Sequence, residues 1–160
     1  MSRPAVQQTF EKELESTYRE VAPRLWRALF ASTGDREIAN DAVSEAFAQL
    51  LARGDSVRNM TAWLWRASFS IARGFLKART QDVELHASDA KSVTDEVSVP
   101  EIVRALRMIP TNQRMAVVLH DYADWPVHEV ASILGMSSAT VYVHLSRARR
   151  RLRETMEESQ

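Results

Sequence analysis

The sequence predicts an all-α fold of two small helical domains, at residues 1–80 and 101–160, joined by an acidic, flexible linker at residues 81–100. Apolar residues recur at i, i+3, i+4 and i+7 in both flanking segments, which is the spacing of amphipathic helices. Only 4 glycines and 5 prolines occur in 160 residues that are 45% hydrophobic, so both segments can bury a core. Residues 81–100 lack a sustained apolar stripe and hold one Lys against five Asp and Glu, as a linker would.

The first domain is predicted to contain four helices. The apolar pattern begins at Phe10 and is interrupted at Pro23, which indicates one helix before the proline and a second after it. Gly34 can end the preceding helix and Asp35 can cap the next one, so a third helix is expected over residues 36–53. A loop at residues 54–59 precedes a fourth helix at residues 61–79. The expected core positions are Phe10, Leu14, Tyr18, Val21, Leu25, Trp26, Leu29, Phe30, Val43, Ala46, Phe47, Leu50, Leu51, Leu64, Trp65, Ser68, Phe69, Ile71, Ala72, Phe75 and Leu76.

Asp41 and Glu45 lie four residues apart on the polar side of the third helix. Paired carboxylates can serve acid–base catalysis, but no histidine at a set spacing, glycine-rich phosphate loop or metal-ligand cluster accompanies them. A solvated face or a partner-binding face is therefore the better interpretation, and we expect no catalytic residues, no metal and no cofactor.

The fourth helix carries a narrow polar face beside its broad apolar one. This basic stripe consists of Arg66, Ser70, Arg73 and Lys77, at i, i+4, i+7 and i+11. By itself the stripe fits a solvated ridge as well as a surface for nucleic acid. Its neighbours Trp63 and Trp65 are expected in the core rather than in base stacking, although single-strand binders use such side chains.

The second domain contains a predicted helix-turn-helix. Gly135 can adopt the left-handed conformation that ends a helix, and Ser137 can cap the next helix through the amide of Ala139 or Thr140. The second helix has an apolar stripe formed by Val141, Leu145, Ala148 and Leu152. Its opposite face carries small and polar side chains at the start of the helix and arginines further along. Such a face can contact base edges in a major groove and the flanking phosphates. The arginines at 147–153 alone would favour a solvated helix end, but together with the turn and the cap they favour nucleic-acid binding.

Composition excludes several classes of protein. The absence of cysteine removes disulfides and thiolate chemistry. No apolar run fits a signal peptide or a membrane span, so a cytoplasmic protein without membrane insertion is expected. The net charge is zero, yet Lys and Arg outnumber Asp and Glu by 12 to 9 in residues 1–80 and by 8 to 7 in residues 101–160, so the acidic linker conceals two mildly basic domains.

Several segments then occur in the order and spacing of a known family. They are residues 34–36, 41–47, 62–66, 105–110, 113–114, 129–135, 140–141 and 145–149. The chain resembles, from about Phe10 to Glu154, the extracytoplasmic-function (ECF) type of RNA polymerase sigma factor, which consists of region 2, a linker and region 4. The resemblance implies a non-enzymatic subunit that binds core RNA polymerase and directs initiation at particular promoters.

The resemblance also implies roles for particular residues. Polymerase binding, through the β′ coiled coil, would involve Asp41, Ser44 and Glu45. Contacts to the downstream promoter element would involve Ser56, Asn59, Arg66, Ser70, Arg73 and Lys77. Contacts of the recognition helix to the upstream element would involve Ser138, Ala139, Thr140, Tyr142, Val143, His144, Ser146, Arg147 and Arg150. Region 4 would rest on the β flap, and an anti-sigma factor is implied as a further partner.

The chain departs from the family pattern at several positions. Ser70 stands where the family usually has asparagine, Gly74 where aspartate is common, and residues 142–144 where basic or small polar residues are frequent. Two alternatives therefore stay open: a helix-turn-helix regulator that acts without core polymerase, and a sigma-like adaptor that sequesters a partner without opening promoters.

Overall fold

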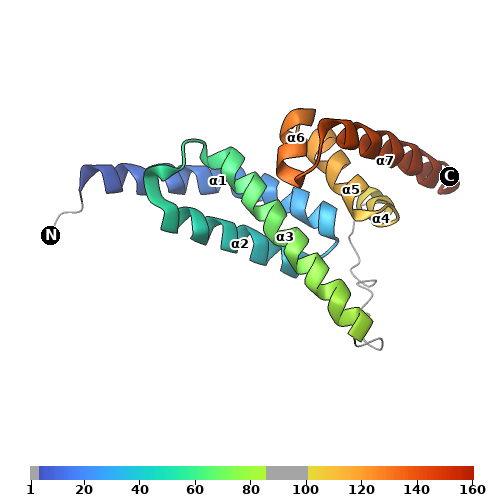
Figure 1. Cartoon of the computed structure of the whole chain (residues 1–160), viewed down its shortest axis with the longest axis horizontal. Coiled ribbons are helices and arrows are strands. Elements are labelled where there is room, and N and C mark those ends of the chain that lie inside the picture. Colours follow the sequence, from blue (N-terminus) through green and yellow to red (C-terminus); the bar gives the residue numbers. More distant parts are fainter. Residues whose placement is uncertain (1–3, 86–100) are drawn as a thin grey trace.

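The computed structural model describes residues 4–85 and 101–160, and in this part of the chain every regular element is helical, as predicted (Figure 1). The predicted linker lies mostly at residues 86–100, outside the described residues. The first group of elements is α1 (Ala5–Thr33), α2 (Arg36–Arg53), the 3₁₀ turn η1 (Gly54–Ser56) and α3 (Met60–Leu85). The second group is α4 (Glu101–Arg107), α5 (Thr111–Val117), the π-helical turn η2 (Val118–Tyr122), α6 (Val127–Leu134) and α7 (Ser138–Glu158).

The prediction of four helices in the first domain is wrong, because α1 runs without a break through Pro23. A proline inside a helix removes one backbone donor and crowds the preceding turn. Pro23 lies on the exposed side of α1, whereas Ala22 and Leu25 are buried on the other side. Burial of this apolar face keeps the helix continuous across the proline, so the first domain consists of three α-helices.

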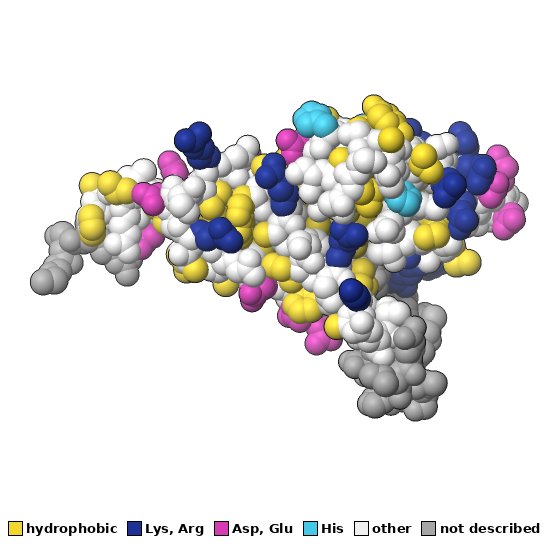
Figure 2. Space-filling model, viewed as in Figure 1, with side chains coloured by type: hydrophobic (Ala, Val, Ile, Leu, Met, Phe, Trp, Pro, Cys, Tyr) yellow, Lys and Arg dark blue, Asp and Glu magenta, His cyan; other side chains and the backbone are white. Residues whose placement is uncertain are grey.

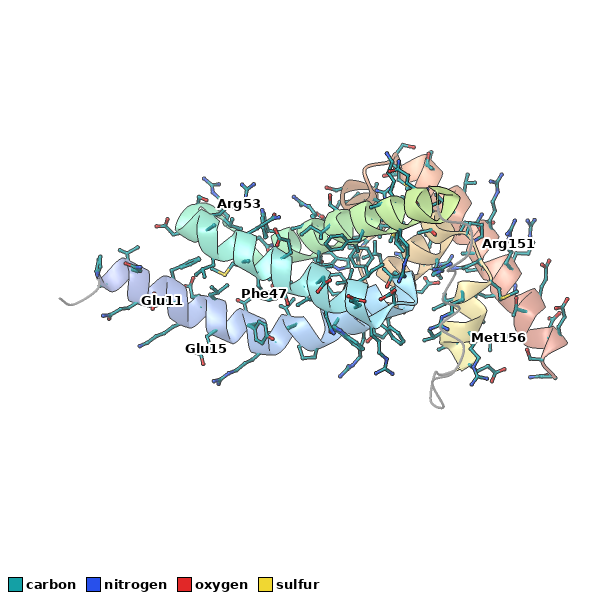
Figure 3. The ribbon with its side chains drawn as sticks, turned by 90° about the horizontal axis from the view of Figure 1, so that it is seen from below. Glu11, Glu15, Phe47, Arg53, Arg151 and Met156 are labelled. Atoms are coloured by element: carbon teal, nitrogen blue, oxygen red, sulfur yellow. The ribbon has the colours of Figure 1, made fainter. Side chains whose placement is uncertain are left out.

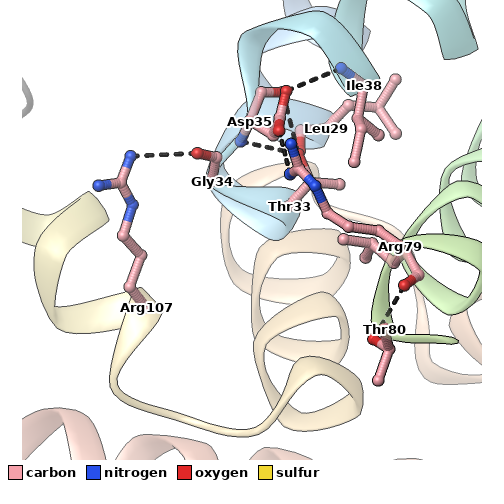
Figure 4. Close-up of polar contacts among 9 residues, drawn as sticks. Leu29, Thr33, Gly34, Asp35, Ile38, Arg79, Thr80 and Arg107 are labelled. Carbon is pink, nitrogen blue, oxygen red and sulfur yellow. Dashed lines mark hydrogen bonds and ion pairs between the residues drawn. The ribbon is translucent and has the colours of Figure 1, made fainter. Parts of the chain in front are cut away.

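The corner between α1 and α2 forms as the sequence predicts. Gly34 has φ 68°, and its N–H donates to the carbonyl of Phe30, which ends α1. The side chain of Asp35 accepts from the N–H of Ile38 at 3.0 Å and caps α2. Asp35 also pairs with Arg79 of α3 (Figure 4). Burial alone would raise the pKa of Asp35, but the Ile38 N–H and the Arg79 guanidinium outweigh burial and hold that pKa below its usual value.

Three expected core positions of the first domain are instead at the surface. Leu51 is 57% exposed, Tyr18 53% and Phe75 39%. Each lies at the edge of an apolar stripe that is wider than the interface the three helices form. In addition, α3 begins at Met60 and continues to Leu85, so it extends five residues into the predicted linker.

The two helical groups pack against each other. One continuous apolar cluster includes Leu25 and Leu64 from the first group and Met115 and Leu134 from the second. α6 contacts α3, and α4, α5 and η2 contact α1 (Figure 1). Within the described residues, no helix is both long enough and apolar enough to span a membrane.

Candidate nucleic-acid and protein interfaces

The helix-turn-helix has the predicted turn and cap. Gly135 adopts φ 64° and ψ 38°, and its N–H donates to the carbonyl of Ala131 at the end of α6. The hydroxyl of Ser137 accepts from the N–H of Thr140 at 3.1 Å, which starts α7. The stripe of α7 is buried at Val141, Leu145 and Ala148 and packs against α6, so the opposite face of α7 points outward.

The face predicted for DNA recognition is open to solvent. Tyr142 is 62% exposed and Val143 46%. The other exposed members are Ser138, Ala139, Thr140, Ser146, Arg147 and Arg150. Figure 2 shows Lys and Arg side chains gathered over the C-terminal part of α7. His144 differs from the rest, because it is half-buried and its Nδ1 atom is buried without a hydrogen-bond partner in the described part of the chain.

One arginine of the α7 cluster is paired within its own domain. Arg149 donates to both carboxylate oxygens of Asp121 in η2, at 2.6 and 3.0 Å. This hydrogen-bonded pairing raises the pKa of Arg149. Sequence periodicity places Arg147 and Arg150 on the recognition face and leaves Arg149 off it. In the structure Arg149 accordingly pairs with η2.

The loop before α3 uses two of the predicted site residues for local structure. The side-chain oxygen of Asn59 accepts from the N–H of Ala62 at 3.0 Å and so caps α3. The hydroxyl of Ser56 donates to the carbonyl of Arg53 at 2.9 Å. The guanidinium of Arg53 lies 5.5 Å from the ring centre of Trp63, so the loop is held on both sides. A base captured here would meet a preformed loop.

The basic stripe of α3 divides into two pairs. Ser70 and Lys77 are exposed. Arg66 is also exposed, but its guanidinium lies 3.3 Å from the carboxylate of Glu129 in α6. Arg73 donates to the carbonyl of Leu134, the last residue of α6. Two of the residues predicted to track single-stranded DNA are thus engaged by the helix-turn-helix in this structure.

Two further arginines join the same two groups of helices. Arg24 of α1 donates to the carbonyl of Tyr122 at 2.8 Å and to the carboxylate of Asp124 at 3.0 Å. Arg107 of α4 donates to the carbonyl of Gly34 at 3.2 Å (Figure 4). With Arg66 and Arg73, these contacts form what we call the seam, which is the polar and apolar contact surface between α1–α3 and α4–α7.

Arg114 is a further, half-buried arginine of the seam, and the sequence pattern indicated no role for it. It donates to the carbonyl of Ser32 at 2.9 Å across the seam. It also donates to the carbonyls of Leu106, Arg107 and Ile109 in its own domain. Burial lowers the pKa of Arg114, and the nearby charge of Arg107 lowers it further. The backbone carbonyls that accept from Arg114 leave no pattern in the sequence.

The face predicted to bind polymerase is accessible. Asp41, Ser44 and Glu45 are all exposed along α2, and Glu45 accepts from Gln49 at 3.1 Å. Beside them a shallow apolar groove runs between α1 and α2, and Phe47 lies in it (Figure 3).

The α1–α2 groove has two adjoining hollows. The first has a volume of about 370 Å³, and Tyr18 packs edge-on against Phe47 in it with ring centres 4.9 Å apart. Leu14 and Leu51 also line it, and Glu11 and Glu15 stand along its α1 edge (Figure 3). The second hollow, of about 360 Å³, is lined by residues that include Trp26, Asn40 and Ser44. The sequence pattern did not predict this groove, because it placed Tyr18 and Leu51 in the core, whereas both side chains are exposed in the structure.

No group of three or more His, Asp or Glu side chains placed to hold a metal ion occurs at residues 4–85 or 101–160. The candidate sites are therefore surfaces: the α7 recognition face, the α3 stripe with its loop, and the α2 face with the α1–α2 groove.

Comparison with known proteins identifies the family. Residues 100–152 match the family model for sigma-70 region 4. The ECF RNA polymerase sigma factor SigL of Mycobacterium tuberculosis is 30% identical over 164 residues, covering 91% of this chain and 89% of SigL. The chain belongs to the ECF family of RNA polymerase sigma factors.

Two further relatives of this ECF sigma factor extend the comparison. The ECF RNA polymerase sigma factor EcfG of Rhodopseudomonas palustris is 28% identical over 140 residues, covering 81% of this chain and 77% of EcfG. The sigma factor RpoE of Bartonella quintana, solved in complex with the anti-sigma factor NepR, superimposes with a TM-score of 0.76 at 20% identity, over 93% of this chain and 99% of RpoE. The fold of this ECF sigma factor is therefore shared across nearly its whole length.

Proposed function

We propose that this sigma factor binds core RNA polymerase and directs transcription initiation by contacting two promoter elements. The observation that carries the proposal is the pairing, in one ECF-family chain, of an exposed recognition face on α7 with a second basic stripe on α3. The proposed division is region 2 at residues 1–80, an acidic linker at residues 81–100 and region 4 at residues 101–160. The protein acts in the cytoplasm as a non-catalytic subunit.

Region 4 supplies the contact to upstream duplex DNA. The exposed start of α7 offers small and hydrogen-bonding side chains to base edges, and Arg147 and Arg150 lie further along the same face to meet phosphates. Tyr142 and Val143 are the most exposed apolar side chains of this face. They are suited to apolar contact with thymine methyl groups, so we assign them the largest part in sequence choice.

Region 2 supplies the contact to the downstream element. The capped loop that holds Ser56 and Asn59 receives a base from the non-template strand, and the α3 stripe follows the backbone of that strand. Ser70 and Lys77 are exposed for this task. Arg66 and Arg73 reach phosphates only after they separate from α6, because both guanidiniums contact that helix.

Region 2 also docks on polymerase. The exposed carboxylates of Asp41 and Glu45, together with Ser44, meet the β′ coiled coil. The apolar α1–α2 groove beside them provides buried area that the three polar residues alone would not. Region 4 rests on the β flap. An anti-sigma factor is proposed as a further partner, since the structurally similar RpoE was solved with one.

The test is run-off transcription with reconstituted holoenzyme, followed by mapping of the transcript starts. Specific starts that share an upstream and a downstream element support the proposal. Retention of this chain on immobilised core polymerase should be lost in Asp41→Ala/Glu45→Ala and kept in the matched control Glu13→Ala/Glu20→Ala, which changes two exposed carboxylates of α1.

Two results would contradict the proposed function. Binding to core without any specific run-off product would indicate a sequestering adaptor. Tight, sequence-specific binding to duplex DNA that core polymerase does not change would indicate a helix-turn-helix regulator that acts alone.

A further inference from the structure

Pro23 lies inside α1 and lines the second hollow of the α1–α2 groove, which we call the Pro23 hollow. We propose that the Pro23 hollow binds an arginine side chain of the β′ coiled coil, and that Pro23 creates the acceptor by leaving a backbone carbonyl of α1 without its helical partner. This inference rests on the proposed docking of region 2 on core polymerase. It adds α1 as a second binding wall and names the chemistry of the partner side chain.

The acceptor is the carbonyl oxygen of Arg19. In an α-helix each carbonyl accepts from the N–H four residues later, and proline has no N–H, so position 23 donates nothing to Arg19. Both residues line the hollow, and Pro23 is exposed. Because the carbonyl of Arg19 points along α1 toward Pro23, a donor that enters the hollow can make the hydrogen bond that the proline omits.

Aromatic side chains line the same hollow. Tyr18 is 53% exposed, and it lines both this hollow and the apolar one beside it. Trp26 is half-buried, and its indole N–H donates to the side-chain oxygen of Asn40 at 2.6 Å, which links α1 to α2 at the hollow. Aromatic rings attract a guanidinium through their electron-rich faces. The hollow thus joins a carbonyl acceptor to two aromatic side chains.

The charge around the hollow favours a cation. Asp41 and Glu45 are exposed on α2, and each directly follows a residue that lines the hollow. Arg19 also lines the hollow, but its guanidinium pairs with Glu15 at 2.6 Å, which balances its charge. The hollow is therefore continuous with the acidic face proposed for polymerase. Arginine suits it better than lysine, because a planar guanidinium can donate to a carbonyl and stack on a ring at the same time.

The experiment measures the affinity of the full-length chain for immobilised core RNA polymerase. Pro23→Ala gives position 23 an N–H, which engages the carbonyl within α1 and removes a residue that disfavours helix interiors. We expect a melting temperature at or above that of the wild type, together with an affinity for core that falls about tenfold, as for the loss of a hydrogen bond to a charged group. A proline with only a structural role would not give this combination.

The matched control is Pro126→Ala, which makes the same substitution at an exposed position directly before α6 and outside the groove. It should leave the affinity for core unchanged. An equal loss of affinity in the two proline variants would contradict the assignment of the acceptor.

A second pair of variants tests the aromatic wall. Tyr18→Leu keeps an apolar side chain but removes the ring, so the affinity for core should fall about threefold. Tyr18→Phe keeps the ring and should bind as the wild type does. Circular dichroism melting verifies that each variant is folded.

The partner side chain is identified by replacing the exposed arginines of the β′ coiled coil with alanine, one at a time. One of these substitutions should weaken binding of the wild type about tenfold and have no further effect on Pro23→Ala, because both remove the same hydrogen bond. Effects that add in every combination would overturn the proposal.

The outcomes separate this inference from the proposed function. If Asp41→Ala/Glu45→Ala loses retention on core while Pro23→Ala and Tyr18→Leu bind as the wild type does, the Pro23 hollow is not an arginine site and the proposed function stands. If the wild-type chain does not bind core polymerase, the proposed function itself fails.

Discussion

α3 and α7 each carry a basic face, but only in α3 are arginines of that face engaged by the other domain. In α7 the outward face holds Arg147 and Arg150 exposed, and Arg149, which is also exposed, pairs with Asp121 of the same domain. In α3 the stripe is crossed by a helix from the other domain, which engages Arg66 and Arg73. Periodicity identifies which side chains share a face, but it does not show whether another part of the chain covers that face.

The largest expected effect concerns the core beneath the covered helix. Trp65→Ala should lower the free energy of unfolding by about 3–5 kcal/mol, because a buried indole is lost from a core that spans both domains. Trp63→Ala, the matched control on the same helix, should cost about 1 kcal/mol, since Trp63 is half-buried and contacts the Arg53 guanidinium. Denaturant titrations measure both values. Equal costs would show that α3 is not held as described.

A smaller effect is expected for two ion pairs, Asp35 with Arg79 of α3 and Asp121 with Arg149 of α7. The pKa of Asp35 is lowered in the folded chain, so the unfolded chain binds protons more readily at this group. The stability that Asp35 contributes is therefore complete above its unfolded pKa, about 4, and is lost as pH falls through the lower folded pKa. Asp35→Asn keeps a side chain that can cap α2 but removes the charge that pairs with Arg79, so it should abolish this part of the acid destabilisation and cost about 1–2 kcal/mol at neutral pH.

The control for Asp35 is Asp121, which anchors α7 through Arg149. Both side chains of that pair are more than a third exposed, so Asp121→Asn should change stability at neutral pH by less than about 1 kcal/mol. Thermal melts of both variants between pH 3 and pH 7 measure the difference. A larger loss for Asp121→Asn than for Asp35→Asn would reverse the ranking of the two anchors.

The smallest effect concerns the free stripe of α7. If roughly four arginines meet phosphates, log affinity for a duplex with the upstream element should fall with log salt at a slope of about −3.6, and Arg150→Ala should reduce the magnitude by about 0.9. Arg149→Ala should leave the slope nearly unchanged, because Asp121 already pairs with that side chain. Holoenzyme binding at several salt concentrations measures both slopes. A change in slope for Arg149→Ala alone would show that the recognition face is assigned to the wrong side of α7.

Much of the fold was predictable because its signals are local. The bounds of α2 follow from the cap at Asp35 and the glycine after Arg53, and the start of α7 follows from Gly135 and Ser137. The buried stripe of α7 also agrees with the sequence pattern. In each case, neighbouring residues set the backbone conformation.

The rest depends on partners far apart in the sequence. Pro23 stays inside α1 because the opposite side of that helix is buried. The residues around Pro23 do not by themselves predict this burial. Leu51 and Tyr18 belong to apolar stripes but line an open groove. The seam arginines bond mostly to backbone carbonyls, and every residue has a carbonyl, so Arg114 and Arg73 had no sequence signature as seam residues.

The most direct test of the central claim, that α3 is covered in the free chain and uncovered in the holoenzyme, is a distance across the seam. The chain has no cysteine, so Ala78→Cys on α3 and Ser132→Cys on α6, both at exposed positions, allow a pair of spin labels across the seam. Pulsed electron resonance should give one short distance in the free protein and a distance longer by at least about 10 Å, one helix diameter, on core polymerase. The same distance distribution in both states would contradict the account.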